Sequence, residues 1–163
     1  MDEEKPEFDL VSLCPPMTFG PVVHPLQDLD GGLKFNESNA MLWRVASSSA
    51  SEGGLPVARV PFWVDVRDLA ALHVGALLER GAGGKRYTVC APERFSYGLA
   101  AEIIRGEFEE LRDGVYTEGQ EIDESYGLDG EVARRELALG DGYRLFRESV
   151  CDLVRQGLEM RST

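Results

Sequence analysis

The chain has 163 residues, of which 43% are apolar and 28% are charged, so it can bury a core as a single domain spanning residues 1–163. Seventeen lysines and arginines oppose 29 aspartates and glutamates, which gives a net charge of −12 at pH 7. This charge repels nucleic-acid phosphates and anionic membrane surfaces, so neither is expected as a partner.

The three cysteines, Cys14, Cys90 and Cys151, are odd in number and form no Cys-x-x-Cys pair. Such usage is typical of reduced thiols in the cytoplasm, which is the expected location. The first six residues are acidic where a secretory leader is basic, and no apolar run approaches the roughly 20 residues of a membrane span.

The spacing of apolar residues, prolines and glycines predicts three strands and five helices. In chain order, the predicted elements are a strand at 8–14, a helix at 36–45, a strand at 60–66, a helix at 65–80, a strand at 86–90, and helices at 96–108, 129–139 and 146–160. Loops are predicted after Pro15-Pro16, over 47–54 and over the acidic stretch 107–124. This order is typical of an α/β protein with few strands.

Helix capping is the simplest interpretation of four polar side chains. Asp65 and Asp68 stand three residues apart at the start of one predicted helix, which approximates a capping box. Ser96 and Asp129 precede two further helices and are predicted to cap them.

Two reactive side chains are interpreted as structural. His73 shares a predicted helical face with Leu69 and Leu77, which favours a hydrogen-bonded core histidine over a catalytic one. Cys14 has no basic neighbour in sequence to lower its pKa, so a buried and inert thiol is expected.

Several stretches, taken in order, resemble one protein family. They are Val11–Pro21, Phe62–His73, Arg86–Val89, Glu93–Ser96, Leu128-Asp129 and Glu136-Leu137. Together they are similar to the C-terminal, substrate-binding half of the extended short-chain dehydrogenases/reductases, especially the fungal dihydroflavonol-reductase-like and ketone-reductase group. The resemblance covers residues 8–160. It implies an α/β fold that is a truncated Rossmann-type reductase half, a few-stranded sheet with about five helices.

The first half of that family binds a nicotinamide cofactor on a glycine-rich turn and activates the carbonyl group with a Tyr-x-x-x-Lys pair. No tyrosine in this sequence is followed by a lysine four residues later. The pattern Gly127-x-x-Gly130 follows an acidic stretch instead of a strand, so it is interpreted as coincidental. We therefore expect no bound cofactor, and no spacing of histidines and acids predicts a metal site.

The resemblance also implies that the first strand pairs with a sheet whose other strands are absent from this sequence. An unpaired edge exposes backbone donors and acceptors, and the apolar face beside it meets water. The strand is expected to gain a partner by self-association, by local refolding or from a separate chain, and a homodimer is the favoured outcome.

Four residues are candidates for a small-molecule site. His24 is the candidate acid or base, because its loop resembles the region where the family binds nicotinamide and substrate; the alternative is a structural hydrogen bond. Trp43 and Trp63 are candidate pocket walls, with core packing as the alternative. Arg59 is the candidate cation that orients the substrate, with a surface ion pair as the alternative.

Three hypotheses for the function remain open. The favoured one is a cofactor-independent cyclase, isomerase or lyase of secondary metabolism, derived from a truncated short-chain reductase and shaping a reactive polyketide- or terpenoid-like intermediate. The alternative is a non-catalytic or split-reductase subunit that pairs with a separate NADPH-binding Rossmann chain. A gene remnant without selected activity is the third.

Overall fold

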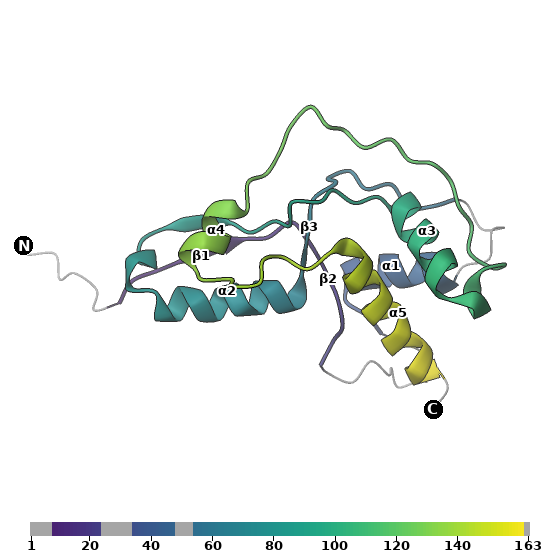
Figure 1. The fold of residues 1–163 in the computed structure, drawn as a ribbon, viewed down its shortest axis with the longest axis horizontal. Coiled ribbons are helices and arrows are strands. Elements are labelled where there is room, and N and C mark those ends of the chain that lie inside the picture. The colour runs from purple at the N-terminus through teal and green to yellow at the C-terminus, as the bar shows by residue number, and fades with distance from the viewer. Residues whose placement is uncertain (1–7, 24–33, 48–53, 162–163) are drawn as a thin grey trace, which may run out of the picture.

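The computed structural model describes residues 8–23, 34–47 and 54–161, and its elements form two groups at opposite ends of an elongated ribbon (Figure 1). One group contains β1 (Ser12–Cys14), α2 (Val66–Leu78), β4 (Arg86–Thr88) and α4 (Glu131–Glu136). The other contains α1 (Glu37–Ser47), α3 (Tyr97–Glu107) and α5 (Phe146–Arg161). Between the groups lie β2 (Met17–Phe19) and β3 (Trp63–Asp65). Two 3-10 turns, η1 (Arg80–Ala82) and η2 (Glu109–Leu111), complete the described elements.

The described strands form two separate parallel pairs. β1 pairs with β4, with Leu13 opposite Tyr87, and β2 pairs with β3, with Thr18 opposite Val64. Pro15-Pro16 joins β1 to β2, so one short stretch of chain contributes a strand to each sheet. The predicted fold class, a few-stranded α/β protein with five helices, is confirmed for the described residues.

Each sheet lies beside its own apolar cluster. Aromatic rings fill the cluster among α1, α3 and α5, where the Trp63 ring centroid lies 5.0 Å from that of Phe146. Leu72, Tyr87 and Leu137 belong to the cluster between α2, β4 and α4. Within the described residues, no helix combines the length and the apolar character that crossing a membrane requires.

Two predicted caps are confirmed. The Asp65 carboxylate accepts a hydrogen bond from the backbone nitrogen of Arg67, and the Ser96 hydroxyl accepts one from the backbone nitrogen of Leu99 at 3.0 Å. The predicted cap Asp129 lies one residue before the N-cap of α4, which is Gly130, and its carboxylate accepts from the backbone nitrogen of Glu131 at 2.8 Å. Asp68 does not cap α2, because its carboxylate accepts hydrogen bonds from Arg144 instead.

The strand β2 was not predicted. Two prolines precede it and Gly20-Pro21 follows it, so the local sequence indicates a loop. Its hydrogen bonds come from β3, which is distant in sequence and therefore leaves no local signal. The predicted strands β1, β3 and β4 are present, each three residues long.

Two structural interpretations were wrong, and both residues lie near the β1 edge. His73 is exposed on α2, with its Nδ1 atom 2.7 Å from the carbonyl oxygen of Leu69. Cys14 is exposed as well, because β1 is a sheet edge and not a buried strand. Only β4 pairs with β1 among the described residues, so no described strand pairs with its other edge.

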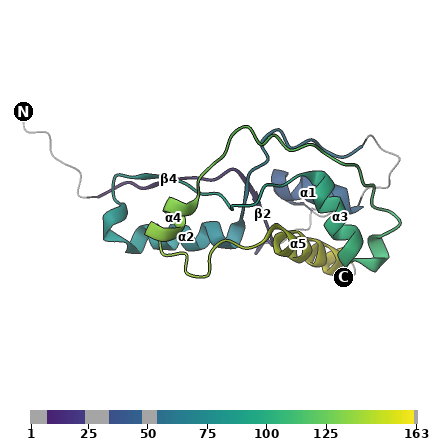
Figure 2. The ribbon, with the colours of Figure 1, turned by 45° about the horizontal axis from the view of Figure 1, so that its top comes forward.

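The acidic stretch 107–124 belongs to a long connection that runs from α3 to α4 and links the two groups (Figure 2). Gln120 fastens it, accepting from the backbone nitrogen of Gly98 at 3.0 Å and donating to the carbonyl oxygen of Pro56 at 2.8 Å. Val115 is buried, whereas most of its neighbours are exposed, as the solvated-loop prediction requires.

Candidate functional site

A groove of about 820 Å³ lies between β2, α1, the segment 56–60 and the pair Phe95 and Tyr97. We call it the α1 groove. Its volume falls in the range of small-molecule sites, which is about 300–1,000 Å³. The walls combine apolar side chains with a few polar ones, as such sites do.

Hydrogen bonds from α1 fix the floor of the α1 groove. The Ser38 hydroxyl donates to the carbonyl oxygen of Thr18 at 2.5 Å. The Asn39 side chain accepts from the backbone nitrogen of Gly20 at 3.2 Å and donates to its carbonyl oxygen at 2.8 Å. Gly20 has a φ of +126° and packs against Val66, so a side chain there would be strained. The groove is therefore built on a rigid strand end.

Tyr97 supplies a hydrogen-bond donor to the α1 groove, and sequence reasoning missed it. Burial, with a smaller contribution from the charge of Glu37, raises the pKa of Tyr97 to about 12. The phenol therefore stays protonated at neutral pH. Its hydroxyl lies 3.3 Å from the Met41 sulfur, and a thioether is a weak acceptor. Tyr97 can thus donate to a ligand oxygen but does not act as a base near neutral pH.

Two arginines, Arg44 and Arg59, also line the α1 groove. Both are exposed, and neither forms an ion pair with any residue that the structure describes. Glu37, in the first turn of α1, is the one acid among the described residues of the groove lining. These residues therefore present two guanidinium groups and one carboxylate.

Of the three predicted site residues that the structure describes, one lies at the α1 groove. Arg59 lines it. Trp43 is half-buried, with its ring centroid 5.6 Å from that of Phe35, and Trp63 is fully buried in the core; neither lines the groove. His24 lies outside the described residues. No sequence signal singled out Tyr97 or Arg44, because both occupy ordinary positions in helices.

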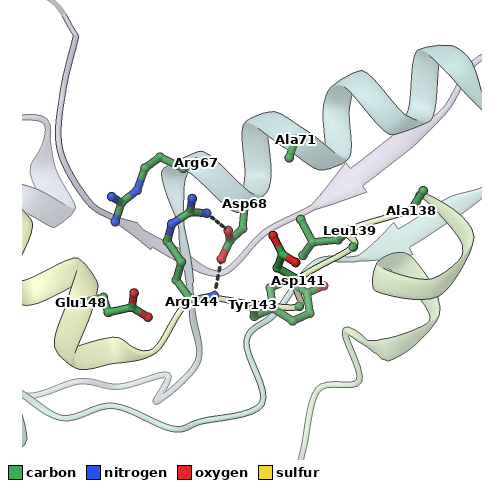
Figure 3. Close-up of a pocket in the computed structure, with 11 residues that line it drawn as sticks. Arg67, Asp68, Ala71, Ala138, Leu139, Asp141, Tyr143, Arg144 and Glu148 are labelled. Atoms are coloured by element: carbon green, nitrogen blue, oxygen red, sulfur yellow. Dashed lines mark hydrogen bonds and ion pairs between the residues drawn. The ribbon is translucent and has the colours of Figure 1, made fainter.

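A second hollow, of about 490 Å³, lies between α2 and the loop that joins α4 to α5 (Figure 3). Asp68 points from α2 toward that loop, where its carboxylate accepts from the backbone nitrogen of Arg144 at 2.7 Å and pairs with the guanidinium group. Burial of Asp68 raises its pKa, and the charge of Asp65 adds to the rise, although Arg144 opposes it. Asp68 thus has a structural role, which is to fasten the loop.

Asp65 carries the opposite shift. Burial alone would raise its pKa, but hydrogen bonds from the Arg67 side chain, Ser149 and the Arg67 backbone, together with the Arg67 charge, hold it below its ordinary value of 3.8. Arg67 also donates to Asp152 on α5 at 2.7 Å. Arg67 is therefore more than a surface ion pair, because one of its partners is a fully buried carboxylate.

The opposite pKa shifts of Asp65 and Asp68 predict opposite pH dependences of stability. The folded pKa of Asp65 is lowered, so its contribution is present above about pH 4 and is lost as the pH falls through the folded pKa. The folded pKa of Asp68 is raised, so the fold gains stability as the pH falls through it toward 3.8. From pH 7 to pH 3, chemical denaturation should show the deficit of Asp65→Asn shrinking and that of Asp68→Asn widening. Parallel curves would contradict this assignment.

An apolar surface lies at the β1 edge, around a hollow of about 470 Å³. We call it the β1–α2 surface; it contains Leu10 just before β1, Leu13 within β1, and Ala76 and Leu77 on α2. Leu10 is 69% exposed and Leu77 is 86% exposed. Leucines this exposed beside an unpaired strand are typical of an interaction surface.

No family model matches the sequence. The ketoreductase azaE of Aspergillus niger is 35% identical to it over 163 residues, which cover 98% of this chain and 46% of that protein. In fold, the crystal structure of Gre2 from Candida albicans matches 98% of this chain and 47% of its own, with a TM-score of 0.80 at 22% identity. The yeast methylglyoxal/isovaleraldehyde reductase Gre2, complexed with NADPH, matches 96% of this chain and 45% of its own, with a TM-score of 0.77 at 23% identity.

This chain is a relative of the short-chain reductases and resembles their C-terminal half. It spans about half the length of these relatives. The resemblance that the motifs indicated is therefore confirmed, as is the Rossmann-type relationship of this reductase half.

The N-termini of α2 and α5 do not fit the pyrophosphate of a dinucleotide. That group normally binds at a helix N-terminus after a glycine-rich turn. Here α2 follows β3 directly, and the Asp65 carboxylate caps its first turn. The first backbone nitrogen of α5 donates to the Glu93 carboxylate. Negative charge at these N-termini repels phosphate.

Proposed function

We propose that this chain is the substrate-binding half of a short-chain reductase, and that it works with a Rossmann-type half docked on the β1–α2 surface. The observation that carries the proposal is the unpaired edge of β1 beside exposed leucines. A strand from a partner can add to such an edge through main-chain hydrogen bonds, while apolar contacts add affinity. Leu77, the most exposed leucine of this surface, would be covered in the complex.

The α1 groove gives this half its role in the reaction. Its apolar walls would hold the body of the substrate, and Tyr97 would donate a hydrogen bond to a substrate oxygen. The cofactor and the carbonyl-activating pair belong to the Rossmann-type half, because this sequence contains neither motif. Binding and orientation of the substrate are thus the functions of this chain.

The cofactor-independent cyclase or isomerase remains the alternative. It requires an acid or base in the groove, and its candidate, His24, lies outside the described residues. It also goes with a homodimer, in which a second copy covers the β1–α2 surface. The shared surface allows one experiment to separate the two functions.

Mixing this chain with the half of the A. niger ketoreductase that it does not match should give a one-to-one complex by native mass spectrometry. The complex should oxidise NADPH with acetophenone as a probe ketone. Leu77→Arg should abolish the complex, because it places a charge in the apolar contact. Leu99→Arg is the matched control, since Leu99 is a partly exposed helical leucine of the other group.

A different set of results would contradict the split-reductase proposal. A homodimer that ignores NADPH, that takes no Rossmann-type partner, and that Leu77→Arg dissociates would overturn the split-reductase proposal. It would favour the cofactor-independent enzyme and justify His24→Ala as the next variant.

A further inference from the structure

We infer that the α1 groove takes a carbonyl compound with an apolar body and a carboxylate group, the carboxylate held by Arg44 and Arg59 and the carbonyl oxygen by Tyr97. This inference rests on the proposed function and names the substrate class of its site. The evidence is the charge, the polarity and the hydrogen bonding of the groove lining.

Arg44 and Arg59 stand out because both line one groove of a chain whose net charge is −12. Five other arginines, Arg67, Arg134, Arg144, Arg147 and Arg155, form ion pairs with acids, whereas Arg80 and Arg86 are exposed without an ion pair to any described residue and lie outside this groove. Arg44 and Arg59 form none with any described residue, although both line one groove. A guanidinium group that no described carboxylate neutralises is available to a carboxylate from outside. Its planar fork matches that group in two parallel hydrogen bonds.

The other residues of the groove lining indicate an apolar body and a keto group in the ligand. Met17, Met41 and Phe95 give the groove apolar walls, which favour an apolar body over a sugar or a nucleotide. Tyr97 stays protonated, and among the described residues its hydroxyl has only the Met41 sulfur as a partner. A carbonyl oxygen is a much stronger acceptor than a thioether, so a keto group satisfies this donor.

The charges along α1 also fix an orientation. Glu37 lies in its first turn and Arg44 in its last turn, so about 10 Å of helical rise separates the two charges. Glu37 repels a carboxylate and Arg44 attracts one. The anionic end of the ligand therefore lies toward Arg44, and a doubly charged phosphate is disfavoured by the same carboxylate.

Isothermal titration of the chain with 2-oxo-4-phenylbutanoate and with its neutral amide tests the inference, because the two ligands share shape and keto group. At low salt the acid should bind about tenfold more tightly, the size expected for one charged hydrogen-bonded contact. Arg59→Gln and Arg44→Gln should each reduce that preference, and added salt should weaken it. Arg86→Gln is the matched control, an exposed arginine on β4 outside the groove.

Tyr97→Phe separates the contribution of the keto group from that of the carboxylate. It should weaken both keto ligands several-fold and leave the affinity for 4-phenylbutanoate, which has no keto group, unchanged. The preference for acid over amide should survive this change.

Equal affinities for acid and amide, unaffected by either arginine substitution, would overturn the inference while leaving the groove as a substrate site. Absence of binding by both ligands would also overturn it. The proposed function fails separately, by loss of the Rossmann-type complex, because that test probes the β1–α2 surface and not the groove.

Discussion

Replacing Arg67 with methionine is expected to lower the free energy of unfolding by about 3 kcal/mol. The Asp65 carboxylate is fully buried and accepts three hydrogen bonds from Arg67, from its backbone nitrogen, Nε and Nη2, at 2.8, 2.9 and 2.8 Å. The substitution removes two of these and leaves a buried charge held by Ser149 and one backbone group. An uncompensated buried charge is among the most destabilising changes.

Arg155→Met provides the control for Arg67→Met. Arg155 pairs with the same Asp152 at 3.0 Å, but it is largely exposed, so its loss should cost below about 1 kcal/mol. Urea denaturation followed by circular dichroism measures both free energies. Equal losses in the two variants would show that Asp65 does not depend on Arg67.

The second large effect is expected at Gly130, where alanine should lower the free energy of unfolding by about 3 kcal/mol, the upper end for overpacking. A Cβ atom there would collide with the carbonyl oxygen of Cys90 and would lie 2.8 Å from its nitrogen and 2.9 Å from its carbonyl carbon. The φ of Gly130 is −93°, which any residue adopts, so the cost is steric. Backbone atoms yield less readily than a side chain, which makes the collision expensive.

Gly127→Ala is the control, because nothing lies within 4 Å of a Cβ atom at that position. Its melting temperature should match that of the wild type, whereas that of Gly130→Ala should fall. Similar melting temperatures in the two variants would contradict the close approach of α4 to Cys90.

This pair also explains the glycine pattern that resembled a dinucleotide turn. Gly130 is required because α4 passes directly against the end of β4, and the Tyr143 hydroxyl donates to its carbonyl oxygen at 2.8 Å. Gly127 faces open space. The spacing is therefore a packing feature, in agreement with the interpretation of the motif as coincidental.

The sequence predicted what depends on neighbouring residues. The helices and the caps Asp65 and Ser96 follow from local patterns, and the structure contains them. The partner of Asp68 lies 76 residues away and could not be found from spacing. The face of α2 that holds His73 and Leu77 is exposed and not part of the core. Helical periodicity identifies such an apolar stripe but does not show whether other parts of the protein cover it.

The candidate site was predictable only in part. Arg59 was chosen for its charge and does line the groove, whereas the two tryptophans, chosen for their size, pack elsewhere. Tyr97 is a candidate site residue because burial keeps its phenol protonated and because its hydroxyl donates only to a weak acceptor, the Met41 sulfur, among the described residues. Neither property is visible in the sequence.

The prolines between β1 and β2 connect the strand edge where a partner would pair to the groove where a ligand would bind. Pro15-Pro16 is a stiff joint with restricted backbone torsions, and Pro16 itself lines the α1 groove. A partner that pairs with β1 therefore also sets the position of Met17 and Thr18 at the groove floor. Any such effect is reciprocal: if docking raises the affinity for a ligand, the ligand raises the affinity for the partner by the same factor. Assembly and substrate binding would then be one coupled equilibrium.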